Sequence, residues 1–364
     1  MKPYLLIIFG AAAFTITFLF IPVLIKLLSQ LKVFDAPGKH KIHQHYVPSM
    51  GGVCIVMGAA FAQIIGLPFS EWAHLKYFYI TIAMMFITGL RDDILTLSPR
   101  QKLIGQILPV IIVVVFGDTI LWSFYGVFFE DVVFHNVVAW GVTIFTIVIL
   151  TNAYNLIDGL DGLAGTVGMI ALLCFGTWFY LAGDFTMALI SLSFFSSLAA
   201  FLWFNWEPSR IFMGDTGALV VGLLLSILTI KFINTNYLLP DNNPIRFTST
   251  IGTAIMIMII PIFDTLRVII LRLRRFQSPF RADKNHLHHQ FLKLGFSHSK
   301  TVLVISAIHL FFVMLAFVLK SKPDSIIIPT AIVGCVAINA AIKLAQKRYE
   351  RNGGKSLIAD QREQ

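Results

Sequence analysis

Eleven apolar runs separated by short polar segments form the main pattern of this chain. A helix that crosses a hydrocarbon core of about 30 Å needs roughly 20 apolar residues, and most of the runs approach that length. Lipid offers the backbone no hydrogen-bond partner, and the runs lack the alternation of a membrane strand, so we expect helices. The runs lie at about 4–26, 50–67, 76–90, 104–121, 136–156, 163–182, 185–204, 217–233, 248–271, 301–319 and 325–342. The second, third and fourth are short or interrupted, which leaves ten spans as the alternative.

The composition supports a membrane protein. Of the 364 residues, 57% are hydrophobic and 13% are charged, whereas a soluble domain carries roughly 25% charged residues. We therefore expect an all-α polytopic membrane protein with about eleven transmembrane helices in one domain, residues 1–342, followed by a charged cytoplasmic tail, residues 343–364. The first run is read as a membrane helix because it is longer than the apolar part of a signal peptide and lacks a cleavage site.

The basic residues give an orientation. If the N-terminus lies outside and the segments alternate, all but six of the 28 Lys and Arg residues fall on the inner side, as the positive-inside rule requires. We expect the C-terminus in the cytoplasm. The excess of basic residues then reflects orientation in the bilayer and phosphate-bearing partners, and no motif for binding nucleic acid is present.

Five polar islands collect most of the carboxylates, amides and imidazoles, and all five fall on the expected inner side. They are residues 34–52, 89–106, 152–165, 204–222 and 263–291. Such a concentration on one face predicts a site at the cytoplasmic surface. An acidic site in a membrane chain is also compatible with a secondary transporter. Transporters, however, usually place such residues near the midplane and often contain repeats, and no repeat is visible here.

The second and fourth islands carry acids that suit a metal ion. Asp92 and Asp93 are adjacent and repel one another, which a divalent cation would relieve, although they could merely end a helix. Mg²⁺ binds oxygen ligands and uses one or two carboxylates beside substrate phosphates. Asp215 lies in "FMGDTG", where a helix start could cap itself or direct free N–H groups at an anion.

The third island, "NAYNLIDGLDGLAG", repeats a polar residue every third position. On a helix with 100° per residue, Asn152, Asn155 and Asp158 share one face, which predicts substrate-binding amides beside a carboxylate. Asp161 would leave that face, but the glycines at 159 and 162 permit a break that returns it to the site.

The fifth island contains three histidines that could hold zinc or clamp phosphate. His286, His288 and His289 match no standard zinc spacing, and basic residues including Arg281 flank them. We expect a phosphate or diphosphate clamp. The basic residues at 272–275 could equally be an ordinary inner-side anchor, and His298 and His309 are expected to be satisfied core or interfacial histidines.

Taken in order from about residue 34 to 296, the islands resemble the polyprenyl-phosphate N-acetylhexosamine-1-phosphate transferase superfamily. The resemblance implies Mg²⁺-dependent attack of undecaprenyl phosphate on a UDP-sugar, with Mn²⁺ as a substitute metal, to give undecaprenyl-diphospho-sugar and UMP for envelope glycans. A homodimer is compatible with the superfamily. The "HLHH" form in "RADKNHLHHQF" is similar to the GlcNAc-1-phosphate branch. The MurNAc-pentapeptide branch, the alternative, has three consecutive histidines.

The resemblance also implies roles for individual residues. Asp92 and Asp93 match the paired aspartates near the lipid phosphate, and Asp215 matches the principal magnesium ligand, with Asp93 as a second candidate for the metal. The other catalytic positions are Lys102, expected at the diphosphate, Asp158, Asp161, His286, His288 and His289. The substrate-binding matches are Asn155, Asn205 and Phe212 near uridine, and Lys41 and His43 in the first inner loop, where His40 replaces an arginine common in the family.

Overall fold

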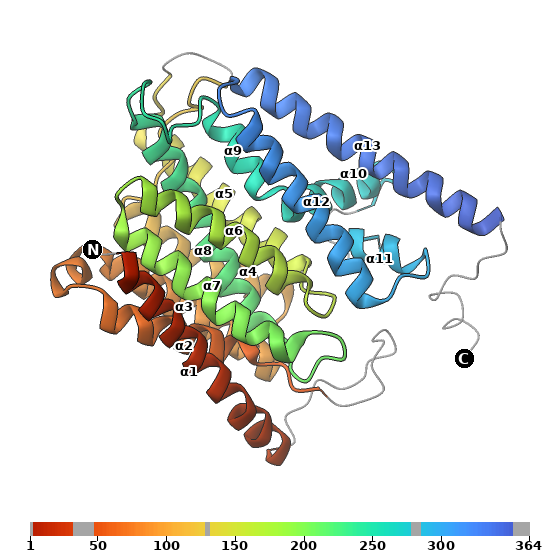
Figure 1. The fold of residues 1–364 in the computed structure, drawn as a ribbon, viewed down its shortest axis with the longest axis horizontal. Helices are drawn as coiled ribbons and strands as arrows, with labels where there is room; N and C mark the ends of the chain where they lie inside the picture. Colours follow the sequence, from red (N-terminus) through yellow and green to blue (C-terminus); the bar gives the residue numbers. More distant parts are fainter. Residues whose placement is uncertain (1–2, 32–46, 128–131, 278–284, 352–364) are drawn as a thin grey trace.

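The computed structural model describes residues 3–31, 47–127, 132–277 and 285–351, which form thirteen helices and no strand (Figure 1). The expected all-α architecture is confirmed for these residues. The helices are α1 (Pro3–Gln30), α2 (Gly51–Gly66), α3 (Phe69–Leu95), α4 (Pro99–Val115), α5 (Asn136–Leu156), α6 (Leu163–Leu181), α7 (Phe185–Asn205), α8 (Gly214–Leu238), α9 (Thr250–Ile257), α10 (Ile259–Leu273), α11 (Leu287–Leu292), α12 (His298–Val318) and α13 (Asp324–Arg351).

All eleven apolar runs lie mainly in helices, but fewer than eleven helices of the described chain meet the length and composition of a membrane span. Eight helices of the described chain are long and apolar enough to cross a bilayer, or nine if the bent pair α9 and α10 is counted as one span. Helices α2 and α4 have 16 and 17 residues, and at 1.5 Å per residue they reach only about 25 Å. The protein is therefore a polytopic membrane protein, while the expected number of spans is not confirmed.

The run at 248–271 breaks in its middle, where α9 and α10 meet at 83°. Pro261 explains the break, because a proline in a helix removes an N–H group and its ring clashes with the carbonyl four residues earlier, here that of Ile257. The ring nitrogen Nε2 of His309 lies 2.7 Å from that carbonyl oxygen. His309 is thus a buried histidine that satisfies the freed carbonyl, as a core histidine should.

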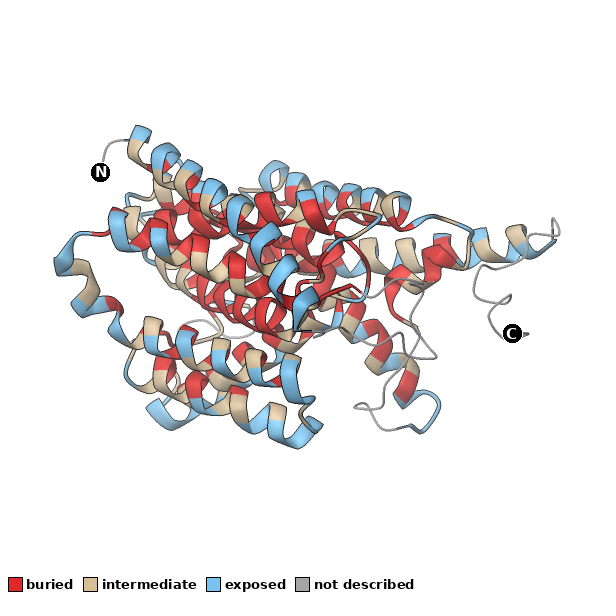
Figure 2. Cartoon of the chain, turned by 90° about the horizontal axis from the view of Figure 1, so that it is seen from below, coloured by how far each residue is buried: buried red, intermediate tan, exposed pale blue. Residues whose placement is uncertain are grey.

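Helix α8 forms the centre of the bundle. Every residue from Thr216 to Ile230 is buried, as expected of a helix that is apolar on all faces. It packs mainly on α3 and α5, and also on α2. Figure 2 shows buried residues along the inner helices and exposed residues on the outer faces. Exposed apolar side chains such as those of Phe145 and Trp203 suit contact with lipid.

Glycines bring two neighbouring helices against the first turn of α8. A Cβ atom on Gly52 of α2 would lie 2.0 Å from the backbone nitrogen of Gly217, and one on Gly89 of α3 would lie 2.5 Å from the Cα atom of Thr216. The backbones touch directly, so this turn has a fixed position relative to α2 and α3. The acidic residues of the second and fourth islands meet here.

The last helix, α13, is longer than its apolar run. It continues to Arg351, which is nine residues into the segment expected to be a tail. Gln346 on this extension donates hydrogen bonds from Nε2 to the backbone and side-chain oxygens of Gln290, at 3.0 and 3.2 Å. The C-terminal end of α13 therefore contacts the histidine segment (residues 285–292) through Gln346.

Candidate functional site

The first turn of α8 is held by a carboxylate from α3. One oxygen of Asp93 accepts the backbone N–H of Asp215 at 2.7 Å, and the other accepts the backbone N–H of Thr216 at 3.0 Å and the Thr216 hydroxyl. Gly214 makes room for it, since its φ is +72° and a Cβ atom there would lie 2.7 Å from an Asp93 oxygen. The free N–H groups expected to face an anion thus face Asp93.

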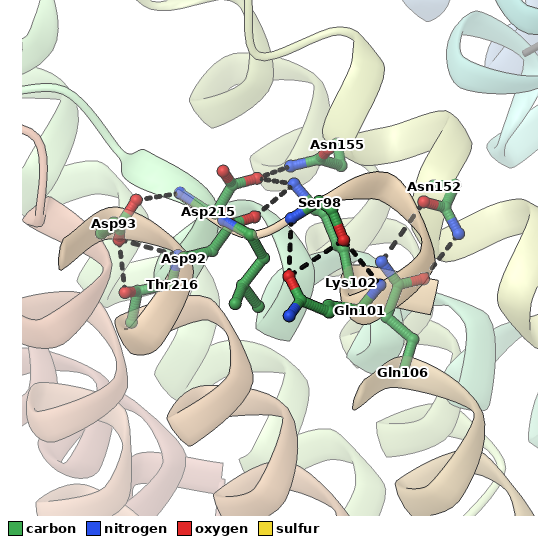
Figure 3. A network of polar contacts seen from close by, with 11 residues as sticks. Asp92, Asp93, Ser98, Gln101, Lys102, Gln106, Asn152, Asn155, Asp215 and Thr216 are labelled. Atoms are coloured by element: carbon green, nitrogen blue, oxygen red, sulfur yellow. Dashed lines mark hydrogen bonds and ion pairs between the residues drawn. The ribbon is translucent and has the colours of Figure 1, made fainter. Parts of the chain in front are cut away.

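The carboxylate of Asp215 on α8 accepts hydrogen bonds from two other helices, and a shared ammonium links it to a third (Figure 3). Its oxygen Oδ1 accepts hydrogen bonds from the Lys102 ammonium of α4 and from Asn155 Nδ2 of α5, the latter at 2.7 Å. The same ammonium lies 3.0 Å from Asp92 Oδ2 of α3, and Asp92 Oδ1 accepts the backbone N–H of Leu97 at 2.6 Å. The structure therefore brings together four of the residues predicted from separate islands.

A pair of amides joins α4 to α5 one turn from this cluster. Asn152 Nδ2 donates to Gln106 Oε1 at 2.6 Å, and Gln106 Nε2 donates to Asn152 Oδ1 at 3.3 Å. Asn152 also donates to the carbonyl of Val148 at 2.8 Å. Its amide thus joins two helices of the protein.

The chain leaves the helix earlier than the sequence pattern suggested. Helix α5 ends at Leu156, so residues 157–162 form a loop before α6 and Asp158 is not on the helical face shared by Asn152 and Asn155. Burial, followed by repulsion from Asp215 and Asp93, raises the pKa of Asp158 well above its usual value. The loop therefore brings Asp158 into the acidic cluster by a turn and not by helical periodicity.

Asn205 connects this loop to the segment that leads into α8. Its Oδ1 accepts the backbone N–H of Gly162 at 2.9 Å, and its Nδ2 donates to the carbonyl of Ile211 at 2.9 Å. Phe212, next along that segment, donates its backbone N–H to Pro48 and accepts that of Gly51, at 2.9 and 2.8 Å. Both residues predicted for a uridine pocket thus lie in the connections that position the loops.

The histidine segment lies against the 157–162 loop. A Cβ atom on Gly159 would meet Nε2 of His288 at 3.0 Å, and His298 Nδ1 lies 3.3 Å from Asp161 Oδ2. The rings of His288 and His289 have centroids 4.3 Å apart. Burial, followed by repulsion from His289 and His286, lowers the pKa of His288 well below its usual value. The imidazole that contacts the loop is therefore neutral.

His286 is in contact with Asp264, a residue that was not predicted from the sequence. Its Nδ1 lies 2.9 Å from Asp264 Oδ2, and Asp264 Oδ1 accepts the backbone N–H of Leu287 at 2.6 Å. Asp264 comes from α10, 22 residues before His286, and no local pattern connects the two. His298, expected to be a satisfied core or interfacial histidine, is buried and has Asp161 as its partner, which agrees with that expectation.

The second missed residue had a signal in the sequence. Gln106 lies four residues after Lys102 and so shares its helix face, and only 1% of it is exposed. A buried amide one turn below a selected lysine could have been identified as a neighbour of the site. Lys41, His43 and Arg281 lie outside the described residues.

Some of the predicted metal ligands are arranged in a way that suits Mg²⁺. In the part of the chain that the structure describes, no three Asp, Glu, His or Cys side chains converge as a ready metal site. Asp92 and Asp215 nevertheless face the same ammonium, and two carboxylates completed by substrate phosphates are what Mg²⁺ commonly uses. Asp93 fits less well as a ligand, because both of its oxygens already accept hydrogen bonds from α8.

Comparisons with known proteins cover most of this chain. The model of the family described as Glycosyl transferase family 4 matches residues 75–233. The protein named "Probable undecaprenyl-phosphate N-acetylglucosaminyl 1-phosphate transferase" of Bacillus subtilis (strain 168) is 31% identical over 301 residues, 82% of this chain and 81% of that protein. The protein named "Undecaprenyl-phosphate alpha-N-acetylglucosaminyl 1-phosphate transferase" of Yersinia pestis is 24% identical over 297 residues, 80% of this chain and 78% of that protein. The protein of the same name from Escherichia coli (strain K12) has the same identity and coverage.

Proposed function

This chain belongs to the polyprenyl-phosphate N-acetylhexosamine-1-phosphate transferase superfamily, in its undecaprenyl-phosphate GlcNAc-1-phosphate branch, and on that premise we propose its reaction. The protein transfers GlcNAc-1-phosphate, or a closely related N-acetylhexosamine-1-phosphate, from a UDP-sugar to undecaprenyl phosphate. An oxygen of the lipid phosphate bonds to the β-phosphorus of the UDP-sugar. The bond from that phosphorus to the bridging oxygen breaks, and UMP leaves with the electron pair. The product begins an envelope glycan.

The observation that carries this proposal is the convergence of Asp92, Lys102, Asn155 and Asp215 from four different helices. Phosphoryl transfer between two phosphates requires positive charge and hydrogen-bond donors fixed around the reacting phosphorus. An ammonium and an amide donor meet two carboxylates here. The ammonium can pair with phosphate oxygens, and the carboxylates can hold the metal.

We assign Mg²⁺ to Asp215 and Asp92. A bound Mg²⁺ would draw negative charge from the phosphate oxygens. Lys102 then donates hydrogen bonds to the diphosphate, and Asn155 keeps the Asp215 carboxylate in its orientation. Asp93 acts through the backbone of α8. Because the second pKa of a phosphate is about 6, little proton remains on the lipid phosphate at neutral pH. The aspartate pair therefore positions groups and does not act as a base.

We place the site at the cytoplasmic face of the bacterial inner membrane. The cluster uses the last turns of α3 and α5 and the first turns of α4 and α8, so one end of the bundle holds the whole site. The charge asymmetry along the chain supports the cytoplasm for that end. There the UDP-sugar is accessible from water and the lipid phosphate from the bilayer.

The test is a donor panel with the purified protein, undecaprenyl phosphate and Mg²⁺, read as release of UMP. We expect turnover with UDP-GlcNAc or a related UDP-N-acetylhexosamine, loss of turnover with a chelator, and recovery with Mg²⁺ or Mn²⁺. Turnover with UDP-MurNAc-pentapeptide alone would show that the branch is wrong. Uptake of a solute by liposomes that contain the protein, without UMP release from any donor, would favour a transporter.

A further inference from the structure

Asp264 is a buried carboxylate that binds the histidine segment through both of its oxygens. Only 1% of the residue is exposed. One oxygen faces His286 Nδ1 at 2.9 Å, and the other accepts the backbone N–H of Leu287 at 2.6 Å. A carboxylate can only accept, so the Nδ1 of His286 carries the hydrogen. In the neutral imidazole this leaves Nε2 as the acceptor nitrogen.

The carboxylate is itself held by a chain of contacts that reaches the last helix. Arg267, one turn further along α10, lies 3.8 Å from Asp264 and donates to the carbonyl of Asn285. Its Nε donates to Asn339 Oδ1 of α13 at 3.0 Å. The start of the histidine segment is thus tied to α10 and, through Arg267, to α13, while Gln346 of α13 is bound to Gln290 near its other end.

The other side of the segment meets the residues of the site. The rings of His286 and His288 are nearly parallel, with centroids 5.9 Å apart and an angle of 7° between planes. His288 in turn lies against Gly159, the residue that follows Asp158. A rotation of His286 would therefore shift the ring that contacts the 157–162 loop.

We propose that Asp264 is a positioning residue of the transfer reaction: it fixes the orientation and the tautomer of His286, with Arg267 and Asn339 holding it in place. This inference rests on the proposed function, since it concerns how His286 is aimed during that reaction. Partners that orient a metal-bound histidine typically change metal affinity or activity about 10- to 100-fold when they are replaced, and we expect an effect of this size for the partner of His286.

A second buried aspartate provides the matched control. Asp324 of α13 accepts the hydroxyl of Ser249 and the backbone N–H of Gly252, both at 2.6 Å, and 7% of it is exposed. It fixes the start of α9 as Asp264 fixes the start of α11, but it contacts no histidine. Replacement of either aspartate removes a buried acceptor of two hydrogen bonds, and only one of the two orients an imidazole.

The first experiment is a double-mutant cycle between Asp264→Asn and His286→Ala, with kcat, KM and thermal unfolding measured for each protein. The asparagine amide can donate to Nδ1 and so select the other tautomer. We expect Asp264→Asn to lower kcat about 10- to 100-fold with a small change in KM, and to cause no further loss in the His286→Ala background. Asp324→Asn should lose comparable thermal stability and keep the wild-type kcat.

The second experiment tests the contact with α13. Asn339→Asp keeps an oxygen for Arg267 and should retain turnover, whereas Asn339→Leu removes that acceptor and should lower kcat in the same direction as Asp264→Asn. Independent losses in the double-mutant cycle, or equal kcat in the two Asn339 variants, would overturn the inference while the wild type remained active. A wild-type protein without UMP release would instead reject the proposed function and this inference together.

Discussion

The carboxylate of Asp93 on α3 binds the backbone N–H of Thr216 on α8 at 3.0 Å and also accepts that residue's hydroxyl group. This pair joins two islands that are 123 residues apart. A carboxylate at a helix start satisfies N–H groups that have no partner in the helix and interacts favourably with the positive end of its dipole. The relationship gives Asp93 a structural role that its neighbour Asp92 does not share.

Asp93→Asn should therefore lower both stability and turnover. We expect a loss of about 1–2 kcal/mol, as for a helix cap, and a fall in kcat of at least ~10²-fold because Asp215 lies in the same turn. Thr216→Val keeps the backbone bonds and should lose only about 1 kcal/mol. Thermal unfolding in detergent and UMP release measure the two effects. An Asp93→Asn protein as stable as the wild type would contradict the capping role.

Asp215→Asn should abolish turnover with little loss of stability. The side chain is 31% exposed, and the amide oxygen can still accept from Asn155 while Lys102 keeps Asp92. The control is Asp241→Asn, which neutralises an exposed carboxylate paired with Arg246 away from the site and should leave kcat unchanged. Near wild-type turnover of Asp215→Asn at saturating Mg²⁺ would remove this residue from the metal site.

Gln106→Leu should reduce turnover because Gln106 holds Asn152, one of the predicted substrate-binding amides. The leucine leaves Asn152 without its partner, at a cost of about 1–3 kcal/mol. It also loosens α4, which carries Lys102, against α5. Small displacements of positioning groups can cost up to about 10²-fold in rate, and we expect a loss of kcat of roughly 10-fold or more.

The matched control for this variant is Gln63→Leu. Gln63 is an equally buried amide on α2 that donates to Ser193 at 2.8 Å and accepts from Tyr79 at 3.0 Å. It should lose similar thermal stability and retain kcat. Equal kcat values for the two variants would show that the Gln106–Asn152 pair supports the fold alone.

Asp158→Asn should make the protein more stable at neutral pH and less active. The folded protein raises the pKa of this carboxyl through burial and repulsion from Asp215 and Asp93, so it retains a proton that the unfolded chain releases. Stability linked to this group is present below the usual carboxyl pKa of about 3.9 and is lost as the pH rises toward the raised value. The asparagine carries no charge and removes this loss.

The measurement is the melting temperature of both proteins between about pH 5 and about pH 8, together with UMP release. The stabilisation by Asp158→Asn should grow with pH while kcat falls by at least ~10²-fold. A variant that is less stable than the wild type across this range would show that Asp158 is ionised without cost.

Gly159→Ala should lower turnover by crowding His288. The added Cβ atom would lie 3.0 Å from Nε2 of that ring, which is closer than ordinary contact, so the histidine segment must shift. Gly141→Ala on α5 is the control because no atom lies within 4 Å of the added carbon. We expect a several-fold fall in kcat for the first variant and none for the second. Equal kcat values would show that the histidine segment does not take part in turnover.

The general architecture could be predicted because the bilayer restricts it. Lipid forces an apolar run to become a helix, and the positions of the eleven runs follow from that rule. The break at Met258 could not be read in the same way. Pro22, Pro109 and Pro329 also lie inside helices, so Pro261 alone did not distinguish a break from a tolerated proline.

The residue types of the site could be predicted from the sequence, but the contacts between individual residues could not. Carboxylates, lysine and histidines in successive polar segments indicated which residues gather at one end of the bundle, and the structure joins Lys102 to Asp92 and Asp215. The pairs of Asp93 with Thr216 and of Asp264 with His286 depend on packing between distant helices. No local spacing encodes such pairs, which explains why Asp264 was missed and why the role of Asp93 in holding α8 was not predicted.

The carboxylates that bind the first turns of α8 and α9 imply that these two helix starts are completed at different times during synthesis. Asp93 precedes α8 in the chain, so its carboxylate is already in place when the ribosome delivers the first turn of that helix. Asp324 follows α9 by some 70 residues and accepts the N–H of Gly252. Because the first N–H groups of a helix have no partner within the helix, the start of α9 can mature only after α13 has been translated and inserted. A nascent chain arrested before residue 324 should thus carry a finished α8 and an open α9.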